Sequence, residues 1–143
     1  MPKLFRRILV PFDFSTPATQ ALRAAVELAA AHKGRLLVLH AIQPYYPAGE
    51  GPPWFPPDDV IAADRRRLTA IARKAAGRRV KVDARIVVGN PYEEILKAAR
   101  GTDSIVMATH GRTGLSHMVI GSVAEKVVRH SKVPVLTVRP RTR

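Results

Sequence analysis

The chain has 143 residues, the size of a single domain, and a chain of this length can bury a core without disulfides or a metal. Its side chains are 46% hydrophobic and 24% charged, which argues against disorder, and 24 Lys and Arg against 11 Asp and Glu give a net charge of +13. That charge points to an anionic partner such as nucleic acid, nucleotide phosphates or an acidic membrane surface. The absence of cysteine excludes disulfides, thiolate catalysis and zinc–thiolate sites, and it makes the cytoplasm the default compartment. We expect neither a membrane span nor a signal peptide, because the apolar runs are short and no cleavage site follows the first of them.

Strand and helix patterns alternate from the start of the chain. A β-branched apolar run over residues 7–10 predicts a buried strand. Helical spacing of apolar residues follows from residue 17 to about 32, with Ser15 or Thr16 as the expected N-cap. Residues 36–41 are nearly all apolar and predict a second buried strand. The segment 43–57 then holds six prolines and two glycines, which exclude a regular helix or strand and predict a long loop.

The second half of the chain continues this alternation. Residues 58–77 predict a helix with a basic outer face, and the alternating pattern over 80–88 predicts a strand at an edge of the sheet. Asn90, a capping residue before a proline, starts a helix that ends near residue 100. The series is completed by a strand over 104–108, a helix over 122–131 and a strand over 133–138.

This order of elements predicts an α/β fold. We expect one doubly wound domain over residues 1–143, ending in a basic tail over 139–143, with a five-stranded parallel sheet and helices on both faces. Ligands bind such sheets beyond the carboxyl ends of the strands, where the strand order reverses. A binding site is therefore expected after Val10, His40 and Met107.

The stretches 107–115 and 120–123 carry two glycine turns between a strand and the start of a helix. Glycines let backbone amides approach a ligand closely, since no Cβ intervenes. The amides of Gly121, Ser122 and Val123 would open the helix with unpaired N–H groups at the positive end of its dipole, and the Ser122 hydroxyl would add a donor. The pattern therefore predicts either a phosphate site or a turn that only breaks the chain.

The spacing Ala108-x2-Gly111-x9-Gly121-Ser122 resembles the nucleotide-binding motif of the universal stress protein family, Gly-x2-Gly-x9-Gly-Ser/Thr. Further segments match the family in order, so the resemblance covers nearly the whole chain: residues 8–15, 37–41, 88–91 and 134–138. The resemblance implies a doubly wound fold with strand order 3-2-1-4-5. It also implies a homodimer paired through the last strand, Val133 to Val138, in a family whose members divide into those that bind ATP and those that do not.

Carried over by position, the resemblance implies a role for each matching residue. Asp13 would approach the ribose, Pro11 and Phe12 would line the adenine, and the backbone of Ala41 would hydrogen-bond the adenine edge. The ribose and phosphates would be wrapped by Ala108, Thr109, His110, Gly111, Arg112, Thr113 and Gly114, and the phosphate tail would be held by Gly121, Ser122 and Val123. The implied cofactor is ATP with Mg²⁺ held through its phosphates. Ala108 departs from the motif by one methyl group, and we expect it to weaken binding without blocking the site.

Several of these residues have a second interpretation. Asp13 could instead cap the helix after Ser15, and Arg112 could be either a phosphate ligand or a solvated loop charge. His110 and His117 are expected to be solvated or to contact phosphate, since no third ligand gives them metal-site spacing. His40, in an apolar strand, is expected to be a core histidine. The aromatic side chains of the 43–57 loop are expected either to cover the adenine pocket as a lid or to pack on the domain surface.

No residue set in the sequence supports catalysis or a metal site. There is no nucleophile–histidine–acid order with an elbow motif, no Walker lysine and no close pair of carboxylates, so any ATP hydrolysis is expected to be slow. The leading prediction is an ATP-binding universal stress protein acting as a nucleotide-dependent stress-response or signalling module. The alternatives are a nucleotide-free dimerising stress protein and a basic nucleic-acid-binding module. Nucleic acid is not expected as the main ligand, because most basic residues lie on an outer helix face or in the tail, away from the glycine loop.

Overall fold

Strands and helices alternate from the first element to the last in the computed structural model, which describes residues 3–110 and 120–139. The elements are β1 (Arg7–Pro11), α1 (Thr16–Ala31), β2 (Arg35–Ile42), α2 (Asp58–Ala76), β3 (Lys81–Val88), α3 (Pro91–Ala99), β4 (Ser104–Ala108), α4 (Ser122–His130) and β5 (Val135–Val138). Within these described ranges, no helix is long and apolar enough to cross a bilayer.

The strands form one five-stranded parallel sheet with the order β3-β2-β1-β4-β5, which confirms the predicted fold and strand order. β1 lies at the centre, where Ile8 is in register with Leu36 of β2 and Ser104 of β4. β3 and β5 form the two edges. The alternating pattern of β3 fits its edge position, because only one of its faces is well covered.

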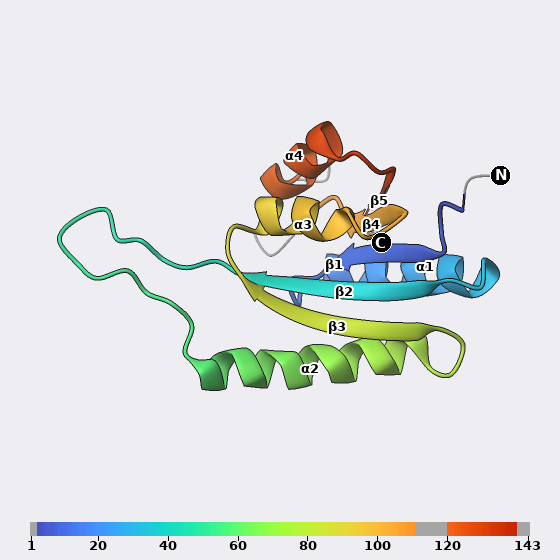
Figure 1. The fold of residues 1–143 in the computed structure, drawn as a ribbon, viewed down its shortest axis with the longest axis horizontal. Helices are drawn as coiled ribbons and strands as arrows, with labels where there is room; N and C mark the ends of the chain where they lie inside the picture. The colour runs from blue at the N-terminus through green and yellow to red at the C-terminus, as the bar shows by residue number, and fades with distance from the viewer. Residues whose placement is uncertain (1–2, 111–119, 140–143) are drawn as a thin grey trace.

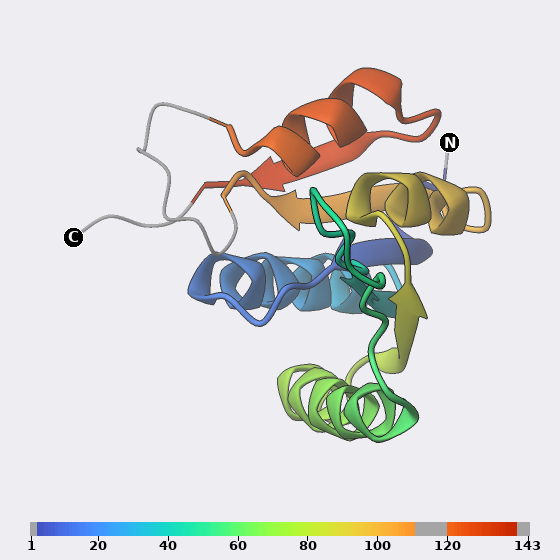
Figure 2. The ribbon, with the colours of Figure 1, turned by 90° about the vertical axis from the view of Figure 1, so that its left-hand side faces the viewer.

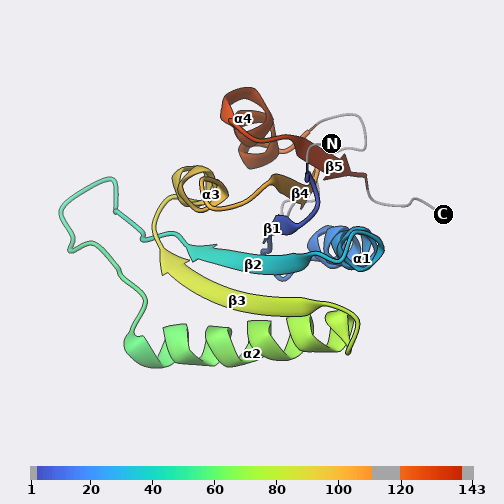
Figure 3. The same cartoon turned by 45° about the vertical axis from the view of Figure 1, so that its right-hand side comes forward.

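Helices cover both faces of the sheet, with α1 and α2 on one face and α3 and α4 on the other (Figures 2 and 3). Successive side chains of β1 point to opposite faces, so Ile8 and Val10 join the core under α1 and α2 while Leu9 joins the core under α3 and α4. These strand residues are fully buried, as the continuous apolar run of a central parallel strand requires.

The start of β5 and the end of β2 are among the strand boundaries that differ from those expected. β5 begins at Val135 and not at residue 133, because the Val133 N–H donates to the Ser131 Oγ (3.1 Å) and so is not part of the ladder. β2 runs one residue beyond its predicted end at Ala41, to Ile42, whose carbonyl accepts from the Gly89 N–H (3.0 Å).

Residues 43–57, called the arm below, extend from the carboxyl end of β2 and stand away from the rest of the domain (Figure 1). Tyr45 and Trp54 exchange two backbone hydrogen bonds of 3.0 and 2.7 Å, and the rings of Tyr46 and Phe55 meet edge to face at 6.0 Å. All of these aromatic side chains remain 45–65% exposed, and none lines the cavity described below. These four side chains therefore neither cover the cavity nor are buried on the domain surface, and both expectations for the aromatic residues of the arm were wrong.

Gly34, at the turn between α1 and β2, allows a close approach of two backbone segments. A Cβ at this position would lie 2.1 Å from the carbonyl oxygen of Phe5, and that oxygen belongs to backbone that a side-chain rotation cannot move. We expect Gly34→Ala to lower the free energy of unfolding by roughly 1–3 kcal/mol, measured by urea denaturation followed by far-ultraviolet circular dichroism. Gly49→Ala on the arm is the matched control, because no atom lies within 4 Å of its added Cβ. Equal stability of the two variants would contradict the close approach.

Candidate functional site

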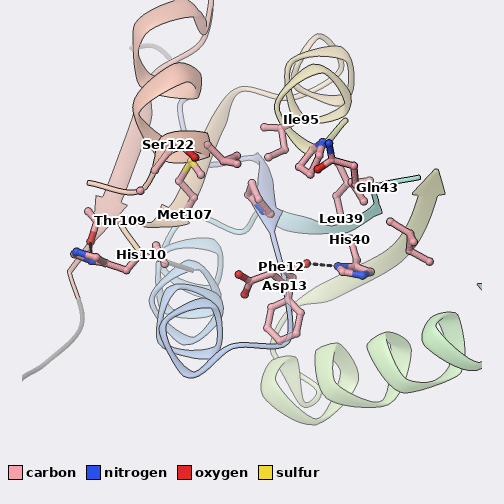
Figure 4. Close-up of a pocket in the computed structure, with 18 residues that line it drawn as sticks. Phe12, Asp13, Leu39, His40, Gln43, Ile95, Met107, Thr109, His110 and Ser122 are labelled. Carbon is pink, nitrogen blue, oxygen red and sulfur yellow. Dashed lines mark hydrogen bonds between the residues drawn. The ribbon is translucent and has the colours of Figure 1, made fainter. Parts of the chain in front are cut away.

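A cavity of about 560 Å³ opens at the carboxyl ends of β1, β2 and β4, beside the amino ends of α3 and α4 (Figure 4). Its volume lies within the range of about 300–1,000 Å³ that is typical of small-molecule sites. β1 is flanked by β2 and β4, so the cavity is at the point where the strand order reverses, as expected for a doubly wound sheet.

Every predicted site residue that the structure describes lines this one cavity. These residues are Pro11, Phe12, Asp13, Ala41, Ala108, Thr109, His110, Gly121, Ser122 and Val123. The other predicted residues, Gly111, Arg112, Thr113 and Gly114, lie outside the described residues, as does His117.

The cavity is also lined by residues that the sequence reasoning missed, namely Leu39, His40, Ile42, Gln43, Pro91, Ile95, Met107 and Ala124. Ile42 was missed because β2 is longer than predicted, whereas Leu39 and His40 were missed because an apolar strand favours core positions for its residues. Pro91 and Ile95 belong to α3, which starts directly after the carboxyl end of an edge strand and so begins at the same edge of the sheet. The Asn90–Pro91 helix start was the sequence signal that could have placed them there.

The turn after β1 positions Asp13. The Asp13 Oδ1 accepts a hydrogen bond from the Ser15 N–H (3.0 Å), and the Ser15 Oγ accepts from the Ala18 N–H (3.1 Å). Ser15 is therefore the N-cap of α1, and neither Thr16 nor Asp13 has that role. The Asp13 carboxylate instead fixes the turn before the helix. Phe14, between Asp13 and Ser15, has a φ of +63°. This left-handed conformation costs a bulky residue about 1–3 kcal/mol.

His40 is half-buried at the cavity wall, so its prediction as a core histidine was wrong. Its Nδ1 lies 2.8 Å from the Phe12 carbonyl oxygen (Figure 4). Since a carbonyl oxygen can only accept, Nδ1 carries the proton in this hydrogen bond. The bond joins the end of β2 to the turn that carries Asp13.

The amino end of α4 faces the cavity, but one of its amides is already used. The Gly121 N–H donates to the Thr109 carbonyl oxygen (2.7 Å), so the prediction that this amide is unpaired was wrong. Gly121 is the N-cap of α4, and the amides of Ser122, Val123 and Ala124 follow it in the first turn. Among residues 3–110 and 120–139 these amides have no backbone acceptor, as expected for the start of a helix.

Thr109 and His110 lie at the end of β4 and are both buried, with His110 only 7% exposed. The Thr109 Oγ1 and the His110 Nδ1 are 2.8 Å apart, and the Thr109 N–H donates to the Val138 carbonyl oxygen (3.1 Å). His110 is thus not solvated, and the other expectation for it, a contact with phosphate, stays a prediction. The bond from the Thr109 N–H extends the contact between β4 and β5 past the last residue of β4.

These groups together define what the cavity can hold. Its walls are largely apolar, Asp13 is the carboxylate among the described lining residues, and the first turn of α4 offers N–H donors at the positive end of the helix dipole. A ligand with a flat apolar part, hydroxyl groups and an anionic group complements this arrangement. Within the described ranges, no group of three or more His, Asp or Glu side chains is placed to hold a metal ion.

Comparisons with known proteins agree with this architecture. The model of the universal stress protein family matches residues 4–139. The universal stress protein in the QAH/OAS sulfhydrylase 3′ region of Thermus aquaticus is 38% identical over 146 residues, which cover 95% of this chain and 100% of the relative.

Two solved structures extend the comparison. The structure of MJ0577 from Methanocaldococcus jannaschii has a TM-score of 0.76 at 28% identity and covers 98% of this chain and 99% of that one. A universal stress protein in complex with cAMP has a TM-score of 0.70 at 26% identity and covers 95% of this chain and 98% of that one.

The capping hydrogen bond at the start of α1 gives a stability prediction. Ser15→Ala removes the acceptor of the Ala18 N–H, and we expect it to lower the free energy of unfolding by about 1 kcal/mol. Thr16→Ala is the matched control, because Thr16 is exposed in the first turn, and a change there is expected to cost less than about 0.5 kcal/mol. Urea denaturation of both variants measures the difference, and an equal or larger effect of Thr16→Ala would contradict the assignment of Ser15 as the cap.

Proposed function

The chain belongs to the universal stress protein family, and we propose that it binds ATP in the cavity at the carboxyl ends of β1, β2 and β4. The bound nucleotide would act as a signal in a stress-response or signalling module of the cytoplasm. The observation that carries this proposal is the convergence of Asp13, the end of β2 and the amino end of α4 on one cavity of about 560 Å³. Nucleotide-bound relatives, such as the family member in complex with cAMP, support it.

In this proposal each part of the nucleotide has a chemical counterpart in the cavity. The adenine would lie between the apolar side chains of Pro11 and Phe12 and the backbone of Ala41. The ribose hydroxyls would donate to the Asp13 carboxylate, and the phosphates would accept from the amides of Ser122 and Val123. The Gly121 amide has no part in this, because it donates to Thr109. The Ala108 methyl group lies on the cavity wall, where it would narrow the space for the ribose.

The lining residues fit nucleotide binding better than they fit catalysis of phosphoryl transfer. Transfer normally requires a positioned base and carboxylates that hold metal ions. In the described part of the cavity lining, Asp13 is the acidic residue. A Mg²⁺ ion would therefore be held through the phosphate oxygens and water, and hydrolysis of the bound ATP would be slow at most.

The proposal includes a homodimer formed along β5. This strand is at the edge of the sheet and pairs on one side with β4. Leu136 in the middle of the strand is 43% exposed, and Val128 on the neighbouring α4 is exposed as well. An apolar strand with one free edge is easily paired with its own copy across a twofold axis.

Gly121→Val tests the nucleotide site. A Cβ at Gly121 would lie 3.2 Å from the Thr109 carbonyl oxygen, and the larger valine side chain would crowd the start of α4 where the phosphates bind. We expect the Kd for Mg-ATP, measured by isothermal titration calorimetry, to rise at least about tenfold, which corresponds to roughly 1.4 kcal/mol.

Gly101→Val is the matched control for this experiment, because Gly101 follows α3 and its added Cβ would have only the Ala98 carbonyl oxygen nearby, at 3.9 Å. This variant should bind like the unmodified protein. Unchanged affinity in Gly121→Val would reject the site. No binding by the unmodified protein would favour the nucleotide-free alternative.

Leu136→Arg tests the dimer. A buried arginine in the middle of a paired β5 edge would be desolvated, and we expect the variant to be a monomer in sedimentation velocity experiments at concentrations where the unmodified protein is a dimer. Val60→Arg is the matched control. Val60 is an apolar residue of similar exposure, 38%, on α2 and far from β5, so this variant should remain a dimer. A dimer in both variants would show that β5 is not the interface.

A further inference from the structure

We infer that Arg67, on α2 and outside the cavity, is a positioning residue for the nucleotide, because it holds Phe14 in the conformation that places Asp13. Arg67, His40 and Phe12 surround the Phe14 ring and are called the Phe14 clamp here. The effect on ATP rests on the proposed function, while the clamp itself is a property of the folded chain. Arg67 is not part of the family's nucleotide-binding motif, and the composition of the chain does not single it out.

Phe14 needs support from its surroundings. Its φ of +63° is a conformation that residues with large side chains rarely adopt, and it persists only when neighbouring groups fix it. Phe14 follows Asp13 directly and precedes Ser15, whose N–H donates to the Asp13 Oδ1. A return of Phe14 to a common negative φ would turn the Ser15 N–H away from Asp13 and break this hydrogen bond to the carboxylate.

Three elements contact the Phe14 ring. The Phe12 ring, directly after β1, meets it edge to face at 5.3 Å, and the His40 ring from β2 meets it at 4.8 Å with an angle of 73°. The Arg67 guanidinium from α2 lies over the ring, with its central carbon 4.2 Å from the ring centroid, which is a cation–π contact. The ring is therefore bounded by both neighbouring strand ends and by a helix.

The clamp is anchored at each end. His40 is fixed by its hydrogen bond to the Phe12 carbonyl oxygen, so it cannot rotate freely away from the ring. Arg67 precedes Leu68, which is fully buried in the core that α2 shares with α1 and the sheet. Packing of α2 thus determines where the guanidinium lies, and the guanidinium in turn limits where Phe14 and Asp13 can move.

The test compares Arg67→Ala with Arg66→Ala. Arg66 is the neighbouring exposed arginine of α2, so both variants lose one positive charge from the same helix and differ in the contact with Phe14. Because an exposed cation–π contact is weak, we expect Arg67→Ala to raise the Kd for Mg-ATP about two- to fivefold and Arg66→Ala to leave it unchanged. Arg67→Lys, which keeps a cation, should recover part of the loss.

A second ligand and a double variant separate positioning from a general structural effect. The loss in Arg67→Ala should disappear with 2′,3′-dideoxy-ATP, which lacks the hydroxyl groups that Asp13 would bind, and it should disappear in an Asp13→Ala background. An equal loss with both nucleotides, or equal affinities of the Arg67 and Arg66 variants, would overturn the positioning role.

Hydrogen exchange of the Ser15 amide tests the clamp without any nucleotide. In Arg67→Ala this amide should exchange several times faster than in the unmodified protein, while Arg66→Ala should leave its exchange rate unchanged. Unchanged exchange in Arg67→Ala would overturn the clamp even if ATP binds. Absence of ATP binding by the unmodified protein, together with faster exchange in Arg67→Ala, would reject the proposed function and leave the clamp in place.

Discussion

β1 lies at the centre of the sheet, hydrogen-bonded to β2 on one side and to β4 on the other, and Ile8, Leu9 and Val10 are fully buried. Alternate side chains of this run enter the two cores, so the burial of one short strand holds helices on both faces. The carboxyl ends of β1, β2 and β4 lie at one edge of the sheet, where the strand order reverses, and the cavity opens there. The position of the site is therefore a geometric consequence of where this buried strand lies in the sheet.

Most of the fold could be predicted because most strands are short apolar runs that alternate with helical patterns. The Asn90–Pro91 helix start and the alternating pattern of the β3 strand are local signals, and the structure agrees with both. The start of β5 could not be predicted, because it depends on a hydrogen bond between Val133 and Ser131 that no residue pattern shows. The exposure of the arm is likewise a tertiary property, set by what does not pack against it.

The candidate site was predictable where a residue lies at or just after the carboxyl end of a strand, as Ala108 and Asp13 do. The site was not predictable where an N–H group could bind either a ligand or another part of the chain. The Gly121 amide lies at the start of α4, but it donates to the Thr109 carbonyl oxygen. The contact between Phe14 and Arg67 could not be predicted from the sequence at all. It joins residues that are distant in the chain and depends on the left-handed conformation of a phenylalanine, which propensity argues against.

The arm has a consequence for the spectroscopy of the protein. The single tryptophan of the chain, Trp54, and two of its three tyrosines, Tyr45 and Tyr46, are on the arm. Intrinsic fluorescence and near-ultraviolet absorbance therefore report mainly on exposed rings outside both cores, whereas far-ultraviolet circular dichroism reports on the helices and strands. Unfolding curves from the two kinds of probe need not coincide, and a difference between them would reflect local opening of the arm and would not be evidence for a folding intermediate of the domain.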